Sequence, residues 1–113
     1  MKVNEFRLGN LIDTDYPILD KTIVVGIISR TKINGVDISK FKPILLTEEW
    51  LLKFGFDKND ELNFVNFSFT VHFWSNNNSY MYNWIGGNIE LKYVHQLQNL
   101  YFALTNKELI LNN

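Results

Sequence analysis

Apolar β-branched residues and polar turn residues alternate along the first third of the chain. Residues 21–33 (KTIVVGIISRTKI) predict a strand, in which Gly26 marks a bulge or a strong bend. Asn34 and Gly35 follow, and because both tolerate positive φ they predict a tight hairpin turn before a return strand over residues 36–41. Bent strands joined by tight turns are how SH3-like barrels begin.

Residues 43–56 (PILLTEEWLLKFGF) carry the clearest helix signal. Thr47 is a good N-cap, two glutamates follow at the positive end of the helix dipole, and Gly55 can end the helix in the left-handed conformation. Such a short helix is unstable alone in water, so its apolar side chains should be buried against a sheet. These side chains are Trp50, Leu51 and Phe54.

Residues 63–74 (NFVNFSFTVHFW) alternate with a period of two, which predicts one strand with an apolar face. That face consists of Val65, Phe67, Phe69, Val71 and Phe73. The loop SNNNS and a second strand, residues 80–85 (YMYNWI), complete a hairpin, and a turn is expected at residues 86–88.

A C-terminal helix is predicted over residues 92–105 (KYVHQLQNLYFALT), with Asn106 as a left-handed cap. Its expected core stripe is Val94, Leu97, Tyr101 and Leu104. A second line consists of His95, Gln98, Asn99 and Phe102. Because this helix is almost uncharged, we expect both of its faces to contact something.

These elements predict an α+β fold: a strongly bent antiparallel sheet or SH3-like partial barrel, packed by a short central helix and a C-terminal helix. With 113 residues and no repeat or linker, residues 1–113 should form a single domain. A net charge of -1 argues against nonspecific nucleic-acid binding. The absence of cysteine excludes disulfides and thiolate sites. No apolar run suits a membrane span or a signal peptide, so we expect a cytoplasmic protein without membrane association.

Catalytic signals are weak. The histidines, His72 and His95, lie in different predicted elements without metal-ligand spacing, and no nucleophile or phosphate-binding motif is present. The helix dipole explains Glu48 and Glu49. We therefore expect no catalytic residue, metal or cofactor, and a small enzyme is the minor alternative.

Candidate binding residues are aromatic, amide-bearing or basic. They are Trp74, Tyr80, Tyr82, Trp84, Lys92, His95, Gln98 and Asn99. An aromatic, amide-rich surface suits both protein partners and planar ligands such as nucleobases. In the structural alternative, the aromatics cover the C-terminal helix, His95 bonds a backbone carbonyl, and the two amides contact a neighbouring loop.

Three segments together resemble a family of short uncharacterised proteins from Bacteroidetes genomes and their phages and prophages. The segments are FRLGNLI (6–12), PILLTEEWLLKFGF (43–56) and KYVHQLQNLYFALTNKEL (92–109). Asn106 departs from the glycine usual in that family, and both residues accept the left-handed conformation. The resemblance implies a mobile-element accessory protein, a type that often antagonises or modulates host systems.

We expect a noncatalytic, homo-oligomeric binding protein that inhibits or modulates a host protein. The alternative is sequestration of a small planar nucleotide-like ligand between subunits, an anti-defence role. A phosphate-bearing ligand would need cations, which Arg7, Arg30, Lys42 and Lys92 can supply. The near-neutral net charge favours the protein partner.

Overall fold

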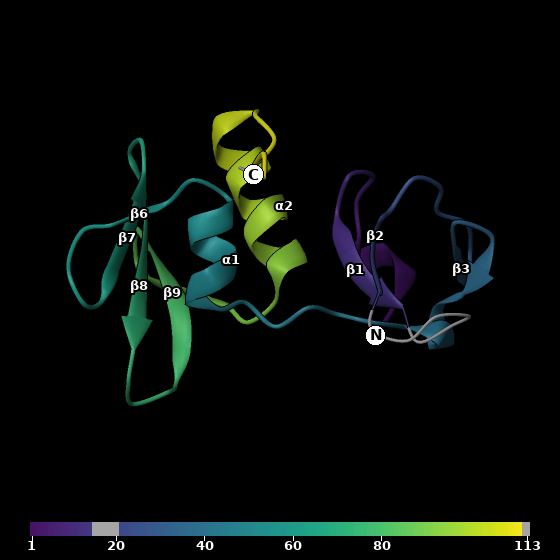
Figure 1. The fold of residues 1–113 in the computed structure, drawn as a ribbon, viewed down its shortest axis with the longest axis horizontal. Helices are drawn as coiled ribbons and strands as arrows, with labels where there is room; N and C mark the ends of the chain where they lie inside the picture. The colour runs from purple at the N-terminus through teal and green to yellow at the C-terminus, as the bar shows by residue number, and fades with distance from the viewer. Residues whose placement is uncertain (15–20, 112–113) are drawn as a thin grey trace. The chain divides into compact units, whose positions relative to one another are not determined.

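A computed structural model describes residues 1–14 and 21–111, without the side chains of Lys21 and Trp84. The chain forms two compact units: unit 1 is Met1–Leu45 with Tyr93–Asn99, and unit 2 is Leu46–Lys92 with Leu100–Asn113. Antiparallel sheets, a short central helix and a C-terminal helix confirm the predicted α+β class, and no described sheet closes into a barrel (Figure 1). No helix in the described ranges is long and apolar enough to cross a membrane. A single domain over residues 1–113 stays a prediction.

Unit 1 contains a three-stranded sheet, a small hairpin and two 3-10 turns. The sheet has the order β2-β1-β5. The elements are η1 (Val3–Glu5), β1 (Leu11–Thr14), β2 (Lys21–Val24), β3 (Lys32–Ile33), β4 (Val36–Asp37), η2 (Ile38–Lys40) and β5 (Phe41–Lys42). Their shared core is a cluster of buried apolar side chains: Phe6, Ile12, Val25, Ile33 and Phe41.

The predicted strand over residues 21–33 is wrong in extent, because β2 ends at Val24. The Asn34 side chain gives the reason: its Oδ1 accepts a hydrogen bond from the Gly26 N–H (2.7 Å), and its Nδ2 donates to the Val24 carbonyl (2.9 Å). This amide bonds backbone groups that a neighbouring strand would otherwise bond. The predicted turn is confirmed, since Asn34 and Gly35 have φ of 53° and 80° between β3 and β4.

The predicted return strand over residues 36–41 is also interrupted. The Asp37 carboxylate accepts a hydrogen bond from the Ser39 N–H (2.9 Å) and caps η2, which separates β4 from β5. Local side-chain bonding of this kind competes with strand pairing. As a result, β5 pairs with β1 instead of extending the hairpin.

In unit 2, helix α1 (Glu48–Lys53) begins and ends as predicted. The Thr47 hydroxyl accepts a hydrogen bond from the Trp50 N–H (3.4 Å), and Gly55 adopts φ 84° after the last turn. The Phe56 N–H then bonds the Leu51 carbonyl (3.0 Å), which completes a Schellman-type end. Leu51 is fully buried, as expected for a short helix stabilised by packing.

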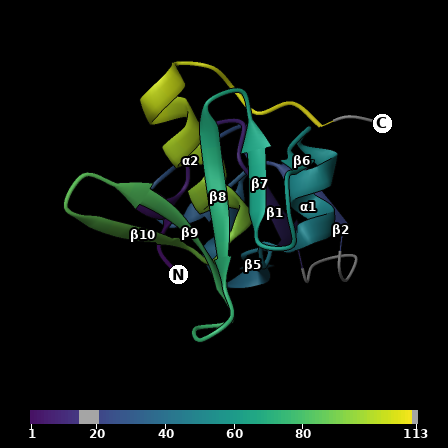
Figure 2. The same cartoon turned by 90° about the vertical axis from the view of Figure 1, so that its left-hand side faces the viewer.

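The remaining strands of unit 2 form one five-stranded antiparallel sheet in the order β10-β9-β8-β7-β6 (Figure 2). They are β6 (Asp57–Lys58), β7 (Asn63–Asn66), β8 (Phe69–Trp74), β9 (Ser79–Trp84) and β10 (Gly87–Leu91). The predicted hairpin of residues 63–74 with residues 80–85 corresponds to β8 and β9. The last turn is at Ile85 and Gly86, earlier than predicted, because Gly86 takes the left-handed φ (88°) and Gly87 already pairs with Trp84.

The prediction of one strand over residues 63–74 is wrong. The chain reverses at Phe67 and Ser68, so that Asn66 pairs with Phe69 and the segment becomes the β7–β8 hairpin. Phe67 adopts φ 54° and is 90% exposed, although it was expected in the core. A two-residue turn removes its residues from the alternation of the ladder, which is why the period of two misassigns Phe67.

Helix α2 (Val94–Thr105) has the predicted type and cap, with Asn106 at φ 59°. Val94, Leu97 and Tyr101 are buried, but Leu104 is 38% exposed, so its assignment to the core stripe is wrong. The chain leaves the helix at Asn106, and Leu109 provides a buried side chain of unit 2 beyond it.

Candidate functional site

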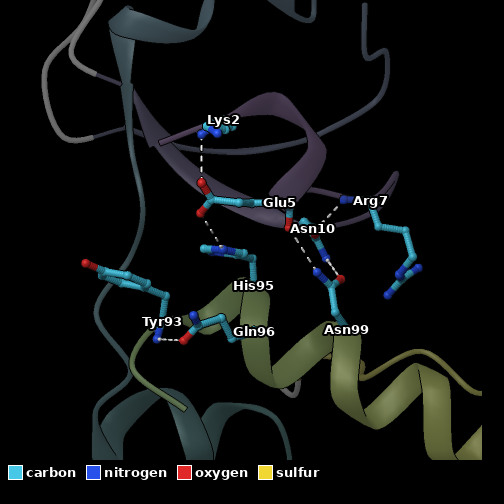
Figure 3. A network of polar contacts seen from close by, with 8 residues as sticks. All are labelled: Lys2, Glu5, Arg7, Asn10, Tyr93, His95, Gln96 and Asn99. Carbon is cyan, nitrogen blue, oxygen red and sulfur yellow. Dashed lines mark hydrogen bonds and ion pairs between the residues drawn. The ribbon is translucent and has the colours of Figure 1, made fainter. Parts of the chain in front are cut away.

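In unit 1, His95 and Asn99 of α2 point toward the segment that precedes β1, where Glu5 and Asn10 lie (Figure 3). Gln98 is 3% exposed. Its Oε1 accepts a hydrogen bond from the Leu11 N–H (2.9 Å), and its Nε2 donates to the Gly9 carbonyl (3.3 Å). Both ends of one buried amide are therefore used to hold the start of β1.

Asn99 continues this network. Its Oδ1 accepts a hydrogen bond from Asn10 Nδ2 (2.8 Å), and its own Nδ2 donates to the Glu5 carbonyl (3.2 Å). Asn10 in turn accepts a hydrogen bond from the Arg7 N–H (2.7 Å) and is fully buried. Gln98 and Asn99 thus make the contacts to a neighbouring loop that the structural alternative describes.

His95 is 1% exposed and lies against aromatic rings of unit 1. Its ring centroid is 4.3 Å from that of Phe6, and Tyr93 stacks on it at 5.7 Å. Its Nε2 lies 3.9 Å from a Glu5 carboxylate oxygen, and its buried Nδ1 has no hydrogen-bond partner among the described residues. Burial lowers the pKa of His95, while the negative charge of Glu5 acts in the opposite direction. The expected bond to a backbone carbonyl is not found in the described part of the chain.

The aromatic candidates of unit 2 lie mainly on the core face of its sheet. The Tyr82 ring stacks on Phe69 at 4.5 Å, and Phe69 lies 5.2 Å from Tyr101 of α2. Tyr80 is buried, and its ring centroid lies 5.0 Å from that of Phe73. Burial raises the pKa of the Tyr80 phenol, and the negative charge of the nearby Glu48 carboxylate raises it further. These contacts fit the alternative in which the aromatics cover the C-terminal helix.

The other predicted binding residues differ in exposure and in the unit to which they belong. Trp74 is 41% exposed at the end of β8, Lys92 is exposed, and the Trp84 side chain lies outside the described residues. His95, Gln98 and Asn99 belong to unit 1, whereas the aromatic candidates belong to unit 2. One binding surface made of both groups stays a prediction.

A groove of about 330 Å³ in unit 2 is lined in part by Phe67, a residue that the period of two over residues 63–74 places in the core. Its lining residues are Phe54, Gly55, Asn66, Phe67, Tyr101, Lys107, Glu108, Leu109 and Ile110. Ile110 and Phe67 both line this groove and are 74% and 90% exposed. The length of the segment is a sequence signal for the turn, because residues 63–74 form a run about twice as long as an average strand of about six residues.

The described residues contain no group of three or more His, Asp or Glu side chains placed to hold a metal ion. The side chain of His72 in β8 contacts that of Asn63, its cross-strand partner in β7. The groove at Phe67 has both polar and apolar walls, and its apolar part suits dispersion contacts and apolar burial. No protein-family model, curated protein or solved structure matches this chain.

Proposed function

We propose that this chain is a noncatalytic binding protein that engages a protein partner through the groove at Phe67. The observation that carries this proposal is the conformation of Phe67, φ 54° with 90% exposure. A bulky residue in the left-handed region is strained by about 1–3 kcal/mol. An exposed ring gains little packing in the folded chain to offset this cost, and residues held in this way concentrate at binding sites.

The partner supplies an apolar or aromatic side chain presented by a loop or a peptide. Phe67 and Ile110 offer exposed apolar surface, and the buried side chains of Phe54 and Tyr101 line the same groove. Anchors of binding energy are typically such apolar contacts surrounded by polar groups. Lys107 and the adjacent glutamate supply polar groups of both signs.

The resemblance to a family from Bacteroidetes and their phages supports a more specific role. We propose that the chain acts in the cytoplasm as a mobile-element accessory protein that inhibits or modulates a host protein. The near-neutral composition, with a net charge of -1, favours a partner held by apolar contacts. Such binding should respond little to salt.

The test uses a partner captured from a Bacteroidetes lysate, purified and titrated against three forms of the chain by calorimetry. Phe67→Asn should weaken binding by about ten- to a hundredfold, because it removes the ring while suiting the turn. Ile85→Asn is the matched control, since Ile85 is 92% exposed and opens the turn of the β9–β10 hairpin. Equal affinity of wild type and Phe67→Asn would refute the proposal.

A second candidate function is sequestration of a small anionic, nucleotide-like ligand in unit 1. A cavity of about 440 Å³ there is lined by Lys2 and Arg30 together with Val3 and Ile38, a combination of cations and apolar walls. Such a volume lies in the range of about 300–1,000 Å³ for small-molecule sites. Titration with nucleoside phosphates should give binding that Arg30→Ala and added salt both weaken. No binding by the wild-type chain would eliminate this candidate.

A further inference from the structure

The two edges of the five-stranded sheet of unit 2 differ. At one edge, β6 is only Asp57–Lys58, a short and charged strand of the kind that discourages pairing with another chain. At the other edge, β10 spans Gly87–Leu91, contains no proline, and is exposed from Gly87 to Glu90. Figure 2 shows the β9–β10 hairpin diverging from β8 toward its turn. Of the two edges of this sheet, the β10 edge has the length and exposure to accept a further strand.

The pairing of β10 with β9 determines which backbone groups this edge presents. Trp84 pairs with Gly87 across a two-residue turn, and such a pair exchanges both of its backbone hydrogen bonds. Bonded and non-bonded pairs then alternate, so Ile89 also directs its N–H and C=O toward β9. The N–H and C=O groups of Asn88 and Glu90 therefore point outward, away from β9.

We propose that the β10 edge binds β10 of a second copy of this chain, antiparallel and centred on Ile89. In this register Asn88 of each copy lies opposite Glu90 of the other. Each such pair exchanges two backbone hydrogen bonds, giving about four between the chains. The two sheets become one continuous sheet across a twofold axis. This inference does not depend on the groove at Phe67.

The side chains favour this register over its neighbour. The two copies of Ile89, each 37% exposed, meet on the face of the sheet that carries the cross-strand partner Tyr82. The amide of Asn88 can donate to the carboxylate of Glu90 across the pair. A register centred on Glu90 would place two carboxylates opposite each other, and it would use Lys92, whose carbonyl already accepts a bond within unit 2.

A single cysteine tests the register, because the chain contains none. Two copies of Ile89→Cys would form a non-hydrogen-bonded pair with Cα atoms about 4.5 Å apart, which suits a disulfide. In a thiol–disulfide buffer Ile89→Cys should accumulate a linked dimer. Asn88→Cys is the matched control, because its two copies lie diagonally, about 7 Å or more apart. Equal linkage of both variants, or none of Ile89→Cys, would overturn the proposal.

Sedimentation equilibrium tests the association without a new covalent bond. Wild-type chain should show a monomer–dimer equilibrium, and Ile89→Lys should raise the dissociation constant by about tenfold or more, because two ammonium groups then face each other. Ile85→Lys makes the same change at the exposed tip of the hairpin, outside the proposed ladder, and should leave the constant unchanged. A wild-type monomer at millimolar concentration, or equal effects of the two lysines, would contradict the β10 interface.

Discussion

Helix α2 contributes residues to both units, and these residues add a different contact in each, although both units also contain buried apolar side chains. The α2 residues of unit 1 hold the chain by directional hydrogen bonds, such as those of Gln98 to Leu11 and Gly9. The α2 residues of unit 2 contribute rings, such as Tyr101 against Phe69. Hydrogen bonds fix which backbone atoms meet, whereas apolar contacts depend mainly on area and shape. The neutral amides of this helix are therefore explained by bonds within unit 1.

The largest expected effect compares two leucines of α2 that have the same spacing pattern but different burial. Leu97 is fully buried, so Leu97→Ala should lower the free energy of unfolding by about 2–5 kcal/mol. Leu104 is 38% exposed, and Leu104→Ala should cost less than about 1 kcal/mol. Denaturant titration measures both. Similar losses of unfolding free energy in the two variants would mean that Leu97 and Leu104 do not differ in burial.

The next effect tests the amides of unit 1. Gln98→Ala should cost about 1–3 kcal/mol, because the buried Leu11 N–H loses its acceptor. The exposed Asn76→Ala should stay within about 0.5 kcal/mol of wild type. Denaturant titration gives the energies, and hydrogen exchange should show lost protection at Leu11. If Gln98→Ala were as stable as wild type, the hydrogen bonds of this amide would not stabilise unit 1.

A smaller effect of opposite sign is expected at the surface of unit 2. Phe67→Asn should raise the free energy of unfolding by about 0.5–1 kcal/mol, because asparagine tolerates φ 54° better than phenylalanine. Thermal and urea unfolding measure this gain, with Ile85→Asn as control. A gain in stability together with weaker partner binding would separate a functional residue from a packing residue. A clear loss of stability would show that the ring contributes to the core.

The smallest effect is a pH dependence from His95 in unit 1. Burial places its folded pKa below the ordinary value of 6.5, so near and below that pH the unfolded chain binds a proton that the folded chain does not. The contribution of neutral His95 is complete above pH 6.5 and is lost as the pH falls through the folded pKa. Urea titrations from about pH 8 to about pH 5 should show this slope. His95→Gln should flatten it, and an unchanged slope in the variant would assign it to other groups.

Local signals determined several elements of this protein from sequence alone. Thr47 and Gly55 set the ends of α1, Asn34 and Gly35 set the β3–β4 turn, and Asn106 ends α2. Each of these depends on the conformational preference of a residue and its immediate neighbours. The α+β class follows from the same periodicities.

Tertiary structure alone decided the rest. The period of two could not show that the chain reverses at Phe67. The same alternating residues are compatible with one long strand or with two strands joined by a turn, and only the pairing of Asn66 with Phe69 distinguishes them. The spacing in α2 likewise could not show whether Gln98 meets a partner or its own β1. Hydrogen bonds between residues that are distant in the sequence form only when the fold brings these residues together. The conformational preferences of neighbouring residues therefore do not predict them.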